Sequence, residues 1–156
     1  MLRLCWLTLL LLAALRLVHA EVIHYQTCPD TEADCTMGEV RVDPCPQAVH
    51  NAACRIRRRR PGSISFKFTP HFDAERLETT LVWVKSETEE LPMVSLERDA
   101  CKNIQCPIKS GELQTYALTA PVEAKFPISS YTIRWRLKDP VSGKMCCFNH
   151  DIKVVN

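Results

Sequence analysis

Apolar and polar residues alternate along much of the chain after residue 20. The alternation covers residues 40–42, 64–68, 131–137 and 148–154, where one parity is mainly apolar and the other mainly charged or polar. A period of two with one polar face is typical of strands in antiparallel sheets. The run LVWV at residues 81–84 is apolar on both parities and predicts a strand that is covered on both faces.

Proline and glycine separate these alternating segments. Pro44, Pro92 and Pro107 interrupt the apolar patterns, and Pro61-Gly62 is expected to form the turn before residues 64–68. No window of a dozen residues carries the apolar repeat of an amphipathic helix. Several short strands with regular breaks predict an all-β fold, specifically a β-sandwich.

The apolar positions of these predicted strands carry most of the large side chains. They therefore form either a packed core or the wall of a pocket. The bulky residues at these positions are Phe66, Phe68, Trp83, Tyr131, Ile133, Trp135 and Phe148. His150 shares the parity of Phe148 and Ile152, which indicates a buried or pocket-lining histidine and not a catalyst.

The sequence carries no recognisable catalytic chemistry. Neither His150 nor the other mature histidines, His24, His50 and His71, lie in a nucleophile or metal motif, and no glycine-rich phosphate loop is present. We therefore expect a protein that is not an enzyme and that needs no cofactor or metal.

The first 20 residues have the pattern of a secretory signal peptide. Arg3 gives a positive start, residues 4–15 are almost wholly apolar, and Val18-His19-Ala20 predicts cleavage after Ala20. A membrane anchor would need about 18 or more apolar residues, and Arg16 interrupts the run earlier. The prediction is a secreted, extracellular protein with one domain at residues 21–156.

Loss of the signal peptide changes the charge balance. Arg3 and Arg16 leave, so the 20 basic residues become 18 against 18 acidic ones. A nucleic-acid partner is therefore not expected, because such proteins usually carry a net basic face.

The mature chain has eight cysteines, since Cys5 leaves with the signal peptide. An even number in an oxidising compartment predicts four disulfides. Zinc is the alternative, but the adjacent Cys146 and Cys147 would point to opposite faces of a strand. Short loops favour the pairs Cys45–Cys54 and Cys101–Cys106. The remaining cysteines, which tie the start of the chain to its end, are Cys28, Cys35, Cys146 and Cys147.

A basic run, CRIRRRRPG, occupies residues 54–62. Its cations are Arg55, Arg57, Arg58, Arg59 and Arg60. One interpretation is a charged strand edge that discourages aggregation. The others are a binding surface for polyanions such as acidic headgroups, and a proprotein cleavage site.

Four stretches together resemble the ML lipid-recognition domain. They are VRVDPCP, CKNIQCPIKSGELQTY, FPISSYTIRWRLKDP and CCFNHDIKVV. The likeness extends over residues 22–155, and it is greatest to the Niemann–Pick type C2-like sterol carriers and the group 2 mite allergens. The adjacent Cys146 and Cys147 resemble the arthropod members.

The resemblance implies an immunoglobulin-like sandwich of two antiparallel sheets, stapled by disulfides, with a lipid cavity between the sheets. It places family pocket positions at Val42, Met93, Pro121, Val122, Phe126 and Trp135. Pro92-Met93-Val94 stands where the sterol carriers have Pro-Phe-Pro. The resemblance also implies the pairs Cys28–Cys147 and Cys35–Cys146.

Three functions are compatible with these features. The first is a secreted, monomeric lipid-binding or transfer protein for a sterol or fatty-acid-like ligand, which meets an acceptor membrane or receptor outside the cell or after delivery to lysosomes. The second is innate-immune recognition of microbial lipids, lipopolysaccharide or lipoteichoic acid, with the arginine run on their phosphates. The third is an adhesion module with a solid core.

Overall fold

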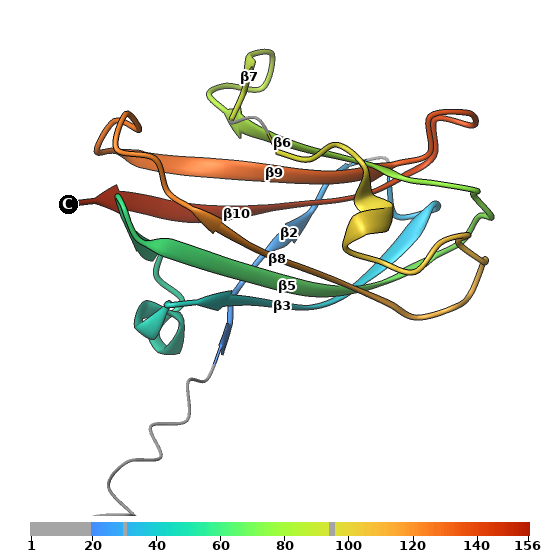
Figure 1. Cartoon of the computed structure of the whole chain (residues 1–156), viewed down its shortest axis with the longest axis horizontal. Coiled ribbons are helices and arrows are strands. Elements are labelled where there is room, and N and C mark those ends of the chain that lie inside the picture. The colour runs from blue at the N-terminus through green and yellow to red at the C-terminus, as the bar shows by residue number, and fades with distance from the viewer. Residues whose placement is uncertain (1–19, 30, 94–95) are drawn as a thin grey trace, which may run out of the picture.

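Two β-sheets pack face to face in the computed structural model (Figure 1). The structure describes residues 20–29, 31–93 and 96–156; the predicted signal peptide before Ala20 and the pocket-segment residue Val94 lie outside the described residues. Ten strands and two short 3₁₀ helices form within the described residues. No helix in this part of the chain is long and apolar enough to cross a membrane.

The first sheet has four strands in the order β1-β3-β5-β8, and neighbouring strands run antiparallel. Their bounds are Glu21–Val22, Cys35–Asp43, Pro61–Pro70 and Gln114–Pro121. The pairing of β3 with β5 shifts register between Met37 and Val40, where a bulge bends the strand.

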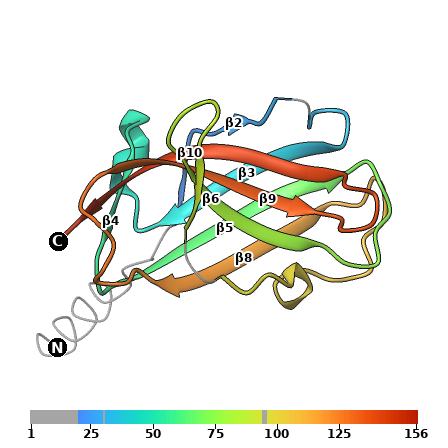
Figure 2. The same ribbon diagram turned by 90° about the horizontal axis from the view of Figure 1, so that it is seen from above.

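The second sheet has the order β2-β10-β9-β6-β7, with β4 added beside β10. The bounds of β2, β4, β6, β7, β9 and β10 are Gln26–Thr27, Cys54–Arg57, Glu78–Val84, Glu90–Pro92, Ser130–Lys138 and Met145–Val155. Strand β4 runs parallel to the end of β10 (Figure 2), and the other pairings are antiparallel. The 3₁₀ helices η1 and η2 span Pro46–His50 and Ala100–Lys102.

The alternation in the sequence corresponds to the two faces of these sheets. In β9, Tyr131, Ile133 and Trp135 are buried, whereas the arginines at 134 and 136 are half-buried on the other face. In β5, Phe66 and Phe68 are buried between the sheets. The predicted all-β sandwich of two sheets is confirmed.

Two local predictions were wrong. Pro61 and Gly62 are not the turn, because they begin β5 and pair with the end of β8. The turn lies one step earlier, at residues 58–60, where Arg59 has a positive φ of 62°. Residues 81–84 are only half-buried, since β6 has a covered inner face but no layer over its outer face.

Aromatic side chains fill the middle of the sandwich. Phe66 stacks on Tyr116 with ring centroids 4.9 Å apart, and it meets the edge of Phe148 at the same distance. Phe66 comes from one sheet and Phe148 from the other, so this contact joins the two layers. Such pairs add about 0.5–1.5 kcal/mol beyond the burial of their area.

Four disulfides bind the strands together, in the pairs expected. They are Cys28–Cys147, Cys35–Cys146, Cys45–Cys54 and Cys101–Cys106. The adjacent cysteines of β10 point to opposite faces, so Cys146 crosses to β3 of the other sheet while Cys147 reaches the segment after β2. We call this end, where β3 begins and β5 ends, the closed end.

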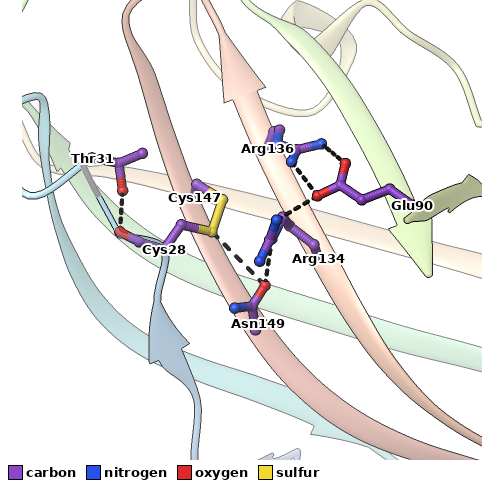
Figure 3. The surroundings of a disulfide bond; sticks show 7 residues. All are labelled: Cys28, Thr31, Glu90, Arg134, Arg136, Cys147 and Asn149. Carbon is purple, nitrogen blue, oxygen red and sulfur yellow. Dashed lines mark hydrogen bonds and ion pairs between the residues drawn. A yellow bond between two sulfur atoms is a disulfide. The ribbon is translucent and has the colours of Figure 1, made fainter. Parts of the chain in front are cut away.

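An ion-pair network covers the outer face of the second sheet near Cys147 (Figure 3). Glu90 accepts hydrogen bonds from Arg136 at 2.6 and 2.9 Å and also pairs with Arg134. Arg134 Nε donates to Asn149 at 2.8 Å. Hydrogen bonding from Arg136 holds the pKa of Glu90 below its usual value. The network links β7 to β9 across the intervening strand β6.

The two bridges to β10 should act non-additively. Either bridge alone closes a ring of more than 100 residues, and the second then closes only the short segment between Cys28 and Cys35. Removing one pair, Cys28→Ala with Cys147→Ala or Cys35→Ala with Cys146→Ala, should therefore lower the free energy of unfolding by about 2–3 kcal/mol. Removing both pairs should lower it by about 7 kcal/mol. Urea denaturation measures these losses, and simple additivity of the two single losses would contradict the shared ring.

Candidate functional site

A cavity of about 150 Å³ lies between the two sheets, at the end opposite the closed end. We call this the open end; β3, β8 and β10 finish there, and β5 and β9 begin there. Strands of both sheets supply the wall, so the cavity depends on the packing of the two layers. The third alternative predicted a solid core, which the structure does not have.

The cavity is present because inward-facing side chains become smaller toward the open end. Along β5 the inner positions run from Phe68 and Phe66 to Ile64 and Gly62, and only the last two line the cavity. Strand β8 follows the same trend, from Tyr116 through Leu118 to Ala120. Small side chains cannot fill the roughly 10 Å between packed sheets, and the space remains.

Seven of the predicted lipid-binding residues line the cavity. They are Val42, Met93, Pro121, Val122, Phe126, Ile133 and Trp135. Val42 comes from β3 of the first sheet and Ile133 from β9 of the second, so both layers contribute to the wall. The structure thus brings together residues that are separated by up to about 90 positions in the sequence.

The other five predicted residues do not line the cavity. Phe66, Phe68, Tyr131 and Phe148 are buried in the core, and Trp83 is half-buried with its ring 5.1 Å from that of Tyr131. Phe66 supports the cavity from behind, because its ring centroid is 5.9 Å from that of Trp135. The alternation in the sequence identified these residues as inward-facing. It could not distinguish residues of the cavity wall from residues of the core.

Several wall residues were not among the predicted lipid-binding residues, although His150 was expected to be buried or pocket-lining. They are Ile56, Gly62, Ser63, Ile64, Leu81, Leu96, Leu118, Ala120, His150, Ile152 and Val154. Some shared the parity of predicted neighbours, as Ile64 does with Phe66 and Ile152 with Phe148. The decrease in side-chain size along β5 and β8 was the signal in the sequence that would have located the cavity.

Trp135 and His150 form the floor of the cavity, which is its surface nearest the aromatic core. Trp135 pairs with Phe148 across β9 and β10, and His150 pairs with Ile133. The two floor residues are therefore diagonal neighbours on one face of the sheet. Both are buried, with 5% and 7% of their surface exposed.

The floor residues carry polar atoms in apolar surroundings. Trp135 Nε1 and His150 Nδ1 are buried and have no hydrogen-bond partner among the described residues. Burial lowers the pKa of His150 to about 4, and the carboxylate of Asp151 opposes this shift only in part. The imidazole is therefore neutral at pH 7.

We expect Met93, Val122 and Phe126 to form the mouth of the cavity, because all three line it and they follow strands β7 and β8. The backbone N–H of Met93 donates to the carbonyl of Leu81 at 3.0 Å, and that of Phe126 donates to Glu123 at 3.2 Å. These bonds fix the backbone at Met93 and Phe126, whose apolar side chains line the cavity.

The arginine run joins β4 to β5 beside this mouth. Arg59 N–H donates to the carbonyl of Val122 at 2.7 Å, and Val122 N–H donates to the carbonyl of Arg60 at 3.0 Å. Arg58 is half-buried, and its guanidinium donates to the Ala124 carbonyl at 3.2 Å and to the Asn156 side chain. The other four, Arg55, Arg57, Arg59 and Arg60, are exposed, and no ion pair is found for them among the described residues.

The described part of the chain holds no group of three histidines, cysteines or carboxylates arranged to bind a metal ion. What the cavity offers instead is a mainly apolar wall; the nitrogens Trp135 Nε1 and His150 Nδ1 of its floor residues are themselves buried.

The buried histidine predicts a specific loss of stability in acid. Because the pKa of His150 is about 4 in the folded chain and 6.5 ordinarily, the unfolded state takes up the proton first. The contribution of neutral His150 to the free energy of unfolding is complete above pH 6.5. It falls by about 3 kcal/mol as the pH drops toward 4. In urea denaturation between these values, His150→Leu should lack this part of the slope, whereas the exposed control His50→Leu should keep it. An unchanged slope in His150→Leu would refute the assignment.

Known proteins resemble this chain over almost its whole length. A moth protein from Manduca sexta, named "MD-2-related lipid-recognition protein", is 34% identical over 96% of this chain and 95% of its own length. The mouse "NPC intracellular cholesterol transporter 2" is 27% identical, with 96% of both chains covered.

A solved structure shares the fold. The Niemann–Pick type C2 protein from the Japanese carpenter ant superposes with a TM-score of 0.70 at 21% identity, over 88% of this chain and 99% of the ant chain. The family model described as the ML domain matches residues 22–154. The chain is a member of the ML domain family.

Proposed function

We propose that the protein binds one hydrophobic ligand between its two sheets and carries it outside the cell. The observation that supports this most directly is the apolar cavity, which opens between two layers of a single domain. The names of relatives agree, since the moth protein is named for lipid recognition and the mouse protein for cholesterol transport. Chains with this fold need no covalent chemistry to perform such a role.

The size of the cavity favours a slender ligand. One buried water takes up about 10–15 Å³ of such space, so 150 Å³ corresponds to on the order of ten waters. An acyl chain suits this volume better than the fused rings of a sterol. Enclosing about 500 Å² of apolar surface would contribute roughly 12 kcal/mol at most. Association costs of several kcal/mol reduce this to micromolar or tighter binding.

The remaining features of the proposal concern location and partners. Residues 1–20 act as the signal peptide, and residues 21–156 form the mature, monomeric, secreted domain. Ligand passes to an acceptor membrane or a receptor, in the extracellular space or after delivery to lysosomes. The four disulfides suit an oxidising compartment.

The arginine run supports a second candidate, recognition of a microbial lipid. Its turn is hydrogen-bonded to Val122, which lines the cavity, so exposed guanidinium groups stand beside the mouth. Arginine binds phosphate through its planar fork of donors. A phosphorylated lipid such as lipopolysaccharide would place acyl chains in the cavity and phosphates on Arg57, Arg59 and Arg60.

The first test is a titration with a fluorescent fatty acid, which the secreted protein should bind saturably. Met93→Ala and Phe126→Ala should each weaken binding by about 1–3 kcal/mol, because each removes a large apolar contact at the mouth. Leu113→Ala is the control, since this side chain is exposed and lies outside the cavity. Failure to bind either fatty acids or sterols would refute the proposal.

Stability measurements separate a binding role from simple core filling. Phe68 is fully buried in the core and away from the cavity, so Phe68→Ala should cost about 3–5 kcal/mol of unfolding free energy. Phe126 is half-buried, and its truncation should cost clearly less. If both truncations destabilise the protein equally, or if Phe126→Ala leaves affinity untouched, the mouth has been misplaced.

The second candidate is tested by removing charge at the mouth. The triple variant Arg57→Ser, Arg59→Ser, Arg60→Ser should weaken binding to lipopolysaccharide or lipoteichoic acid roughly tenfold, because exposed ionic contacts contribute about 0.2–1 kcal/mol each. Fatty-acid binding should stay the same. A charge-matched control at the closed end is Lys109→Ser, Lys138→Ser, Lys144→Ser. Equal effects of the two triple variants would show that the arginines act only through net charge.

A further inference from the structure

The arginine run contains one arginine that the fold itself uses and four that it leaves exposed. The guanidinium of Arg58 donates to the Ala124 carbonyl and to the Asn156 side chain, so it ties the turn to the segments that follow β8 and β10. The other four are exposed and have no ion pair among the residues that the structure describes; they are Arg55, Arg57, Arg59 and Arg60. These four guanidinium groups are available to an external partner.

Strand β4 and the turn after it arrange the four exposed arginines in a row. Burial alternates along β4, so Arg55 and Arg57 are exposed while their neighbours in the strand are buried. Alternate residues of a strand lie about 7 Å apart on one face. The turn continues the row with Arg59 and Arg60, and two backbone hydrogen bonds to Val122 fix it. Because sheet and turn already hold this backbone, a partner would not have to order it.

A fifth cation widens the row onto the neighbouring strand. The end of β10 runs parallel to β4 (Figure 2), and Lys153 lies in register beside Arg55. Lys153 is exposed and has no ion pair in the described part of the chain. Two like charges side by side on one face of a sheet repel each other. An external anion would relieve this repulsion.

We call these five cations the basic row; they are Arg55, Arg57, Arg59, Arg60 and Lys153. Their repetition along a strand and a turn suits a linear polymer that carries anionic groups at intervals. Among the described residues, no large exposed apolar side chain lies in β4, in the turn or in β10. Surfaces that insert into membranes combine cations with such side chains, and sites for single-stranded nucleic acid add aromatic ones.

We propose that the basic row binds a linear sulfated polysaccharide, a glycosaminoglycan of the kind found on cell surfaces. The planar fork of arginine donates to pairs of anionic oxygens, and short runs of arginine and lysine are typical of heparin-binding patches. None of the five side chains lines the cavity, so the inference does not depend on lipid binding. It gives the exposed arginines a partner outside the cell and adds Lys153 to their site.

The experiment measures binding of the secreted protein to immobilised heparan sulfate by surface plasmon resonance at about 0.15 M salt. Hyaluronan is the second surface, because it carries carboxylates but no sulfates, and it should bind at least about tenfold more weakly. The triple variant Arg55→Ser, Arg57→Ser, Lys153→Ser should lose about tenfold in affinity for heparan sulfate, since each exposed ionic contact contributes modestly. The charge-matched control at the closed end, Lys109→Ser, Lys138→Ser, Lys144→Ser, should keep its affinity.

A double variant separates this site from recognition of a phosphorylated lipid. Arg55 and Lys153 lie on the sheet, and neither belongs to the turn that is hydrogen-bonded to Val122. Arg55→Ser with Lys153→Ser should weaken binding to heparan sulfate by roughly fivefold, because two ionic contacts are lost. It should leave binding to lipopolysaccharide and to a fluorescent fatty acid unchanged. Loss of lipopolysaccharide binding alone would overturn the proposal in favour of the lipid.

The remaining outcomes either support the polysaccharide or exclude it. No binding to heparan sulfate, equal binding to hyaluronan, or an equal loss in the closed-end control would each overturn the proposal. Tighter binding to vesicles of equimolar phosphatidylcholine and phosphatidylserine than to heparan sulfate would assign the basic row to a membrane instead. The replaced side chains are exposed, so the variants should fold, which circular dichroism checks. If the triple variant does not fold, the double variant still tests the site.

Discussion

The distance between two packed sheets is the constraint on which this molecule depends. Side chains from both inner faces must fill a gap of roughly 10 Å. At the centre Phe66, Tyr116 and Phe148 do so, with centroids 4.9 Å apart in two of their contacts. Toward the open end the same strands carry Gly62 and Ala120, which cannot reach across. The cavity is thus a consequence of decreasing side-chain size on a regular scaffold.

A hollow in a small domain costs stability, because the lining residues lose packing contacts on one side. The closed end offsets this loss. Cys35 joins β3 to Cys146 of β10 and so connects the two sheets covalently, while Cys147 holds the segment after β2. The covalent link between the sheets therefore lies at the end opposite the cavity. A ligand at the other end can contact both layers without being needed to hold them together.

Polar groups at the open end are divided between the mouth and the floor. The mouth has exposed arginines on a turn that is hydrogen-bonded to Val122. At the floor lie a neutral imidazole and an indole N–H, surrounded by apolar side chains. The two positions differ in access, since an exposed guanidinium can meet a phosphate, whereas the two floor nitrogens are buried. The apolar wall between them is common to both candidate functions.

The sequence by itself determined the fold class and much of the covalent framework. Alternation in residues such as 131–137 depends only on the two faces of a strand, and the even cysteine count needs no structure to suggest disulfides. Family resemblance supplied the long-range pairs and placed Met93 and Phe126 near a pocket. Each of these signals is local in the chain or is carried by a recognisable motif.

Only the tertiary structure decided which inward-facing residues belong to the cavity. Phe66 and Ile64 share one parity on one strand, yet Phe66 is core and Ile64 is wall, because the difference depends on what the opposite sheet places across from each. The same holds for His150, whose burial beside Trp135 follows from the register of β9 and β10. Parity reports the direction of a side chain, whereas the space in front of it is set by residues that are distant in the sequence.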